Sequence, residues 1–271
     1  MRIGRSHSRH RALLVVLFFF AALPAVALAA PSVFLEDLTW TELAAQIHGG
    51  RTTIIIPVGG VEQSGPYIAL GKHDARVKIL AERIARNLGN AVVAPVVAYV
   101  PEGGLDPPTE HMRFPGTITV PPAAFRAVLE SAAMSFKLHG FRDIVLIGDH
   151  GGYQAELKAV ADDLNRRWAG SPARAHYIAQ YYQATQIAYV AALRRQGFSA
   201  AEIGVHAGLA DTSLTLAIAP GMVRRIGPGH PGPSQGVSGD PTRASAQLGE
   251  IGVDAIVRET SEAIRAAVRR P

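Results

Sequence analysis

The sequence predicts an α/β fold with three layers, α/β/α, in which helices cover both faces of a mainly parallel central sheet. Two short apolar runs rich in β-branched residues, 52–58 and 144–147, are typical of buried strands. Longer segments with apolar residues at helical spacing lie between such runs, and glycine or proline marks their ends. Strands that alternate with helices in this way pair in parallel and are covered on both faces.

Residues 1–29 have the pattern of a secretory signal peptide. Four arginines precede an apolar run over 12–28, which ends in Ala27–Leu28–Ala29. This pattern predicts cleavage after Ala29. An uncleaved membrane anchor is the alternative, but the run is short for a span and Pro24 interrupts it. We therefore expect an exported protein, periplasmic or secreted, with no stable membrane anchor after cleavage.

Removal of residues 1–29 changes the charge balance. The whole chain carries 27 basic and 22 acidic residues; without the four arginines the balance is 23 against 22. No basic stripe remains, so we expect no nucleic-acid partner. The chain has no cysteine, which excludes thiolate ligands and cysteine nucleophiles. Residues 30–271 are long enough for a single α/β domain with its own core.

The first half of this domain is predicted to alternate between helix and strand. A capping box opens a helix over 39–47, and the strand 52–58 follows. Asp74 can begin the next helix as its N-cap, and a strand follows over 91–98. Apolar residues at helical spacing and a glycine stop define that helix: Val77, Leu80, Ile84, Leu88 and Gly89. The Pro/Gly-rich segment 101–117 is a long loop, and loops of that length are often functional.

The second half continues the same alternation. The predicted segments are a helix that ends at Gly140, the strand 144–147, a helix ending at Trp168, a strand over 173–179, a helix over 183–196, a loop over 204–213 that enters a helix, a Pro/Gly-rich segment over 228–239 and a last helix over 241–268. We find no internal repeat.

The turn 148–152 joins a buried strand to a helix and carries His150. In open α/β sheets, ligands bind at the carboxyl ends of the strands, where this turn lies. Other loops also hold acidic residues and histidines: Glu62, His73 and Asp74; Glu110 and His111; His206 and Asp211. Nitrogen and carboxylate ligands from separate loops suit Zn²⁺, Mn²⁺ or Fe²⁺. A plain strand-to-helix turn with a histidine on it is the simpler alternative.

The chain resembles the creatininase family of metal-dependent amidohydrolases over nearly all of residues 30–271. The matching segments, in the family's order, are Thr39–Trp40, Pro57–Gln63, Gly65–Pro66 with Leu70, Glu110–Thr117, Gly148–Gly152, His206–Gly208, Thr212–Ser213 and Gly236–Pro241. The resemblance implies a three-layer domain, a homo-oligomer that is often a hexamer, and hydrolysis of non-peptide or cyclic amide C–N bonds. It also implies a metal centre that often holds two ions.

The resemblance carries over unevenly to the metal ligands. Glu62 matches the family's first carboxylate ligand and His150 its histidine ligand. Ser64 stands where the family usually has a histidine, and His73 where it has a bridging aspartate. A neutral imidazole has one lone pair and cannot bridge two cations as a carboxylate does. The family's glutamate five residues after the histidine of His-Ala-Gly is here Asp211.

We therefore predict a single metal ion bound by Glu62, His73 and His150. Asp211 is expected as a fourth ligand or as the group that takes a proton from water. If the loop is shifted by one residue, Asp74 replaces His73 as ligand and a two-ion site becomes available.

Three further residues are expected near the substrate. His206 resembles a substrate-contacting histidine of the family and is a candidate proton carrier, with a structural hydrogen bond as the alternative. His111 is expected to line the entrance. Tyr153 is close enough in sequence to His150 to contact substrate or, alternatively, to cover the sheet edge.

These residues favour hydrolysis of a small cyclic or linear amide by a metal-activated water. A fold hosts many functions, so a non-catalytic exported protein that binds a small molecule on the same scaffold is the main alternative. A lactone or formamide hydrolase is another. Because of Ser64 and His73, we do not predict creatinine as the substrate.

Overall fold

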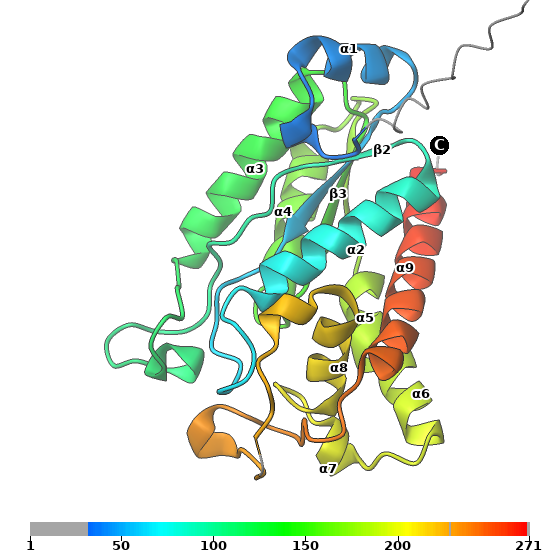
Figure 1. Ribbon diagram of the computed structural model, residues 1–271. Coiled ribbons are helices and arrows are strands. Elements are labelled where there is room, and N and C mark those ends of the chain that lie inside the picture. The colour runs from blue at the N-terminus through cyan, green and yellow to red at the C-terminus, as the bar shows by residue number, and fades with distance from the viewer. Residues whose placement is uncertain (1–31, 228, 270–271) are drawn as a thin grey trace, which may run out of the picture. The chain divides into compact units, whose positions relative to one another are not determined.

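A parallel β-sheet lies at the centre of the computed structural model, which describes residues 32–227 and 229–269 (Figure 1). In that part of the chain four strands take the order β2–β1–β3–β4. They are β1 (Thr53–Val58), β2 (Ala91–Val93), β3 (Asp143–Gly148) and β4 (Arg174–Tyr177). β1 and β3 pair along their whole length, from Thr53 opposite Asp143 to Val58 opposite Gly148. The predicted α/β fold is confirmed. The predicted signal peptide lies outside the described residues.

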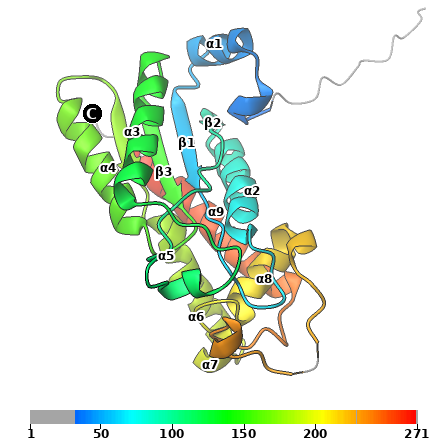
Figure 2. The ribbon, with the colours of Figure 1, turned by 90° about the vertical axis from the view of Figure 1, so that its left-hand side faces the viewer.

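Helices cover both faces of this sheet. Figure 2 shows α3 and α4 on one side of β1 and β3, and α2 and α9 on the other. Successive residues of β1 point to opposite cores: Ile55 packs with the helices of the α2 and α9 side, and Ile54 and Ile56 pack with the α3 and α4 side. This alternation is what a strand buried on both faces requires.

Most helices lie where the sequence predicts them. In the described residues they are α1 (Trp40–His48), α2 (Lys72–Leu88), α3 (Pro122–Leu138), α4 (Gln154–Arg167), α5 (Gln180–Gln186), α6 (Ala188–Arg195), α7 (Ala200–Ile203), α8 (Leu209–Ile218) and α9 (Ala246–Val268). Short 3₁₀ helices occupy Leu35–Asp37, Glu110–Arg113, Pro220–Met222 and Pro233–Gln235.

Several boundaries differ from the prediction. α2 begins at Lys72 and has no side-chain cap, so Asp74 lies in its first turn and is not its N-cap. The predicted strand 91–98 is shortened to β2, with Pro95 just beyond its end. The predicted helix 183–196 is two helices that break at Ile187, and the last helix begins after a Ser245 cap.

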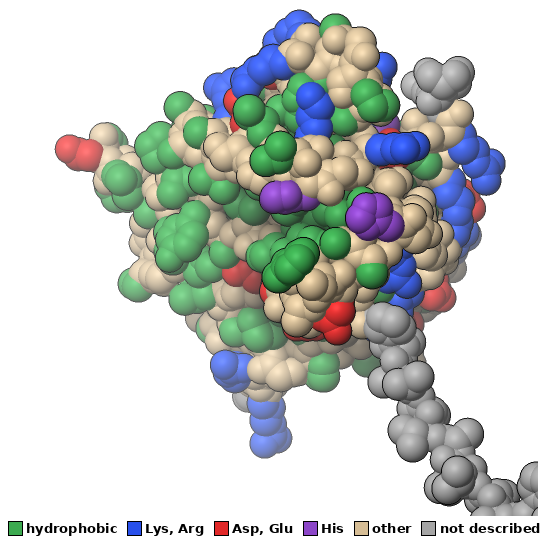
Figure 3. Space-filling view, turned by 90° about the horizontal axis from the view of Figure 1, so that it is seen from above, with side chains coloured by type: hydrophobic (Ala, Val, Ile, Leu, Met, Phe, Trp, Pro, Cys, Tyr) green, Lys and Arg blue, Asp and Glu red, His purple; other side chains and the backbone are tan. Residues whose placement is uncertain are grey.

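Large apolar side chains are exposed on α1 and α3. Trp40 and Leu138 are each 81% exposed, and Val128 and Met134 are also exposed. Figure 3 looks down on this end of the molecule and shows several groups of hydrophobic side chains among polar ones. In the part of the chain that the structure describes, no helix combines the length and apolarity needed to cross a membrane.

Candidate metal centre

Glu62 is fully buried in the loop that leaves the carboxyl end of β1. Its backbone N–H donates to Leu70 O at 3.1 Å, which fixes the loop against the start of α2. Gly60 precedes it with φ of +143°, and a Cβ atom there would lie 2.9 Å from Glu102 Oε1. The glycine therefore allows a second carboxylate to approach this backbone closely.

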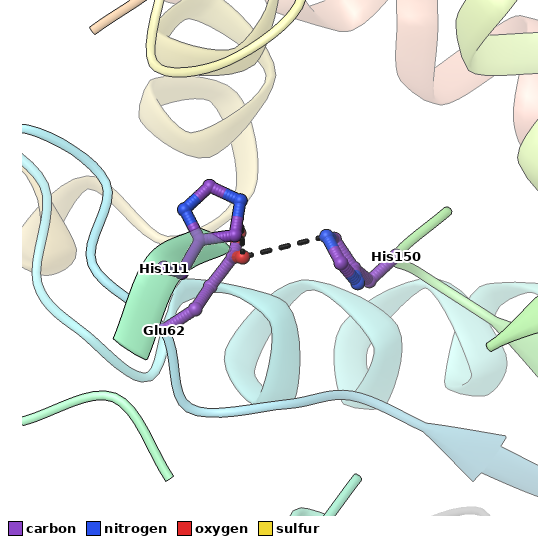
Figure 4. A group of neighbouring side chains, drawn as sticks. All are labelled: Glu62, His111 and His150. Atoms are coloured by element: carbon purple, nitrogen blue, oxygen red, sulfur yellow. Dashed lines mark ion pairs between the residues drawn. The ribbon is translucent and has the colours of Figure 1, made fainter. Parts of the chain in front are cut away.

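Two histidines lie beside Oε2 of Glu62, here called its outer oxygen, as Figure 4 shows. His150, in the turn after β3, and His111, in the 3₁₀ helix Glu110–Arg113, each place Nε2 3.4 Å from Glu62 Oε2. That oxygen is buried and has no hydrogen-bond partner. One ligand atom from each of the three residues lies within 4.8 Å of the others. An orphaned carboxylate oxygen beside two imidazole nitrogens fits a divalent ion such as Zn²⁺ or Mn²⁺.

The electrostatic surroundings of His150 favour metal binding. Burial lowers the pKa of His150 to about 3, so its imidazole is neutral at pH 7 and has a lone pair to donate. On the other side of the ring, Nδ1 lies 3.5 Å from Glu102 Oε1. Nδ1 accepts from the Gly152 N–H at 3.3 Å. Binding of an ion at Nε2 would require the ring proton on Nδ1, where Glu102 Oε1 is a neighbouring carboxyl oxygen.

His73 contacts the other oxygen of Glu62, the inner oxygen Oε1, and lies outside this three-residue group. Its Nε2 lies 2.6 Å from Glu62 Oε1, and its Nδ1 lies 2.5 Å from Asp149 Oδ2. Burial lowers the pKa of His73, but the two carboxylates outweigh it and the net shift is upward. With a carboxylate oxygen at each ring nitrogen, neither nitrogen faces an open position for a metal. Its predicted role as a ligand stays a prediction that this geometry does not support.

Asp211, in the first turn of α8, is engaged by two buried cations. Lys72 Nζ and the Ala207 N–H donate to its Oδ2, and Arg76 donates to its Oδ1. Burial raises the pKa of Asp211, but Lys72 and Arg76 dominate and hold it well below its usual range. A carboxylate so paired is a poor proton acceptor near neutral pH. Asp211 lies outside the group of Glu62, His111 and His150.

Asp74 lies outside the group of Glu62, His111 and His150. Its Oδ1 accepts from the Gly60 N–H at 2.9 Å, and burial raises its pKa. In this arrangement it braces the loop that carries Glu62. The alternative in which Asp74 replaces His73 as ligand finds no support in this position.

His206 lies at the cavity, as predicted for a residue that contacts substrate. Its ring stacks on His111 with a centroid distance of 4.4 Å, and its Nε2 lies 2.9 Å from Gln63 O. The Gln63 side-chain amide Nε2 also lies 3.1 Å from this ring nitrogen. The shorter contact, to the carbonyl, assigns the ring proton to Nε2 and leaves Nδ1 as an acceptor, 3.7 Å from Glu62 Oε1. Burial lowers its pKa to about 4.

Tyr153 is fully buried within the core on the α3 and α4 side. Its hydroxyl donates to Gly59 O at 2.6 Å and accepts from the N–H of His150 at 3.0 Å. It joins the loops after β1 and β3, which corresponds to the structural alternative and not to substrate contact.

Three residues of the site were not predicted from sequence. Lys72 and Arg76 are the buried cations of α2, and Glu102 lies in the long loop. Neither Glu102 oxygen has a hydrogen-bond partner; burial and the Glu62 carboxylate raise its pKa to about 9. The sequence could have indicated two of them only through their positions. Lys72 is next to the predicted ligand His73, and Glu102 lies at the start of the long loop 101–117.

A cavity of about 350 Å³ lies at the carboxyl ends of β1 and β3. Its polar lining includes Glu62, Lys72, His111, His150, His206 and Tyr182. Such a volume suits a small molecule. The cavity, the orphaned carboxylate oxygen and the two neighbouring imidazoles together define the candidate site of a metal-dependent enzyme.

Comparison with known proteins agrees with this class. The family model for creatininase (creatinine amidohydrolase) matches residues 36–264, so the chain belongs to the creatininase family of amidohydrolases. The resemblance predicted from sequence and the enzyme class are thus confirmed.

The sequence identity to individual relatives is low, but each match covers most of both chains. The chain is 26% identical to creatinine amidohydrolase of Pseudomonas putida, over 86% of this chain and 96% of that protein. It is 29% identical to the mycofactocin precursor peptide peptidase of Mycolicibacterium smegmatis, over 78% of this chain and 83% of that protein. A crystal structure of creatinine amidohydrolase matches the fold with a TM-score of 0.75 at 24% identity, covering 89% of this chain and all of that one.

Proposed function

We propose that the protein hydrolyses the C–N bond of a small non-peptide amide, cyclic or linear, at a divalent metal ion held by Glu62, His111 and His150. The observation that carries this is the buried, unpartnered Oε2 of Glu62, with a histidine nitrogen 3.4 Å away on either side. When bound, the ion would acidify a water and polarise the amide carbonyl. The cavity volume favours a small amide over a peptide, although one relative is named a peptidase.

His206 is the residue we assign to proton transfer. Its Nδ1 faces the Glu62 carboxylate and is the unprotonated nitrogen, so it can accept a proton in the cavity and pass it to the leaving amine. Gln63 O fixes the ring for this task, and stacking on His111 keeps it beside the ligands. Asp211, the other predicted proton carrier, is tied to Lys72 and Arg76.

The test is metal content together with activity. Purified protein should retain about one Zn²⁺, Mn²⁺ or Fe²⁺ per chain, and Glu62→Gln and His150→Ala should each lose most of it. His139→Ala, at an exposed histidine on the far end of α3, is the matched control. Full occupancy in both site variants would contradict the proposal. Activity is then screened on cyclic and linear amides with each metal.

A non-catalytic protein that binds a small molecule is the second candidate. It is favoured by the pairing of Asp211 with Lys72 and Arg76, which removes one of the two predicted proton carriers. Tight binding of a small molecule, with no turnover of amides, lactones or formamides, would support it over hydrolysis.

Two further proposals concern the localisation and the oligomeric state of the protein. We propose export through a signal peptide over residues 1–29, on the sequence pattern alone, with N-terminal sequencing of the secreted or periplasmic form as its test. We also propose a homo-oligomer, supported by the exposed Trp40 and Leu138 on neighbouring helices, with light scattering as its test.

A further inference from the structure

Lys72 is a buried cation that the proposed reaction does not use. It is the first residue of α2, its side chain is 1% exposed, and it lines the cavity. Its Nζ donates to Asp211 Oδ2 and lies 3.6 Å from Glu62 Oε1. A buried ammonium is costly unless anions compensate it, so its presence at the metal ligand Glu62 needs an explanation.

The two oxygens of Glu62 have different surroundings. Oε1 receives the hydrogen bond of His73 at 2.6 Å and faces the Lys72 ammonium. Oε2 has no hydrogen-bond partner and faces the Nε2 atoms of His111 and His150. Oε1 thus faces the Lys72 ammonium and the ring of His73, with His206 Nδ1 at 3.7 Å, whereas Oε2 faces the imidazoles of His111 and His150.

The positive charge on the inner side would repel a metal ion. A divalent ion at Oε1 would lie within a few ångströms of the ammonium, in surroundings where water screens charge poorly. Arg76 adds a second cation behind His73, with its guanidinium 2.6 Å from Asp149 Oδ2. An ion at Oε2 would instead lie on the side of the carboxylate that faces the imidazoles of His111 and His150.

We propose that Lys72 is a fixed cation that closes Oε1 of Glu62 to metal ions and confines the centre to one divalent ion at Oε2. This inference rests on the proposed metal-dependent function. Lys72 acts through Glu62, so it is a positioning residue for the metal. The ammonium also lowers the affinity of the remaining ion, because a positive charge next to a ligand carboxylate weakens its attraction for a cation.

The experiment titrates metal-free protein with Zn²⁺ alone, followed by calorimetry and native mass spectrometry. Lys72→Met keeps the length of the chain and removes the charge, and Lys72→Arg keeps the charge. Lys78→Met, at an exposed lysine of the same helix, is the matched control. We expect one ion per wild-type chain, and in Lys72→Met about tenfold tighter binding of that ion and a second ion at saturating Zn²⁺. The two other variants should stay close to wild type.

The outcomes separate this inference from the proposed function. If the wild type binds one ion, His150→Ala loses it and Lys72→Met binds it no more tightly, the role of Lys72 is overturned and the metal centre stands. If neither the wild type nor Lys72→Met binds an ion, the metal-dependent function fails and this inference fails with it. Should Lys72→Met not fold, as judged by circular dichroism, Lys72→Gln gives the same test.

Discussion

At the scale of single residues, Glu102 has the most unusual surroundings in the site. Its side chain is fully buried, and neither oxygen has a hydrogen-bond partner. Burial first, and then the negative charge of Glu62, raise its pKa to about 9. The folded protein therefore keeps Glu102 protonated, whereas the unfolded chain ionises it near 4.5. A carboxyl with a raised pKa costs stability as pH rises from its unfolded to its folded value.

Glu102→Gln should therefore stabilise metal-free protein in a pH-dependent way. Near pH 4.5 the amide and the protonated acid should be nearly equivalent. Above that, the free energy of unfolding of the variant should gain on wild type by up to about 1.4 kcal/mol per pH unit, levelling off near pH 9. Urea unfolding in EDTA from pH 5 to 9 measures this. Glu110→Gln, at an exposed acid of the same loop, should show no such trend, and a pH-independent gain would contradict the assignment.

The site residues in loops that follow strands were predictable from the sequence. Those that reach the site from other elements were not. Glu62 and His150 follow buried apolar runs, so the parallel order of the strands brings them together. Lys72 has no such signal, because its burial depends on Asp211, 139 positions later in the chain. An isolated lysine before a helix is usually solvated, and only the packed fold shows that this one is not.

At the scale of elements, a single hydroxyl joins the loops that carry the ligands. Tyr153, just before α4, donates to the carbonyl oxygens of Val58 and Gly59 and accepts from the N–H groups of Asp149 and His150. The ends of β1 and β3 are thereby held in one register with the turn that bears His150. The sequence predicted both strands, but a tyrosine after a glycine pair gave no sign of this bridging role.

Tyr153→Phe should destabilise the protein and weaken metal binding. The change leaves buried backbone groups without a partner, which costs about 1–3 kcal/mol in the free energy of unfolding. The loosened turn should also lower the affinity for Zn²⁺, measured by calorimetry. Tyr177→Phe removes one hydroxyl that donates to Gln154 at 2.9 Å, and it should leave Zn²⁺ affinity unchanged. Equal metal affinity in Tyr153→Phe and wild type would show that the bridge is structural only.

At the scale of the whole molecule, the layer order was predictable because it depends on local patterns. Each strand is a short apolar run, and the alternation of Ile54 and Ile55 between two cores follows from strand geometry. The ion-pair network was not predictable, because it joins α2 to the turn after β3 and to α8 through Arg76. Pairing between distant segments depends on packing that no local pattern encodes.

The same long-range network leads to a prediction for the stability of the folded chain. If the ion binds only where β1, β3 and the long loop meet, it binds the native state and not the unfolded chain. At a free Zn²⁺ concentration about 100 times the dissociation constant, the native state gains about 2.7 kcal/mol. For a chain of this size that raises the melting temperature by roughly 5–10 °C, and EDTA should reverse it. Differential scanning calorimetry measures the shift. His139→Ala should keep the shift and His150→Ala should lose it; a shift of equal size in His150→Ala would place the ion elsewhere on the protein.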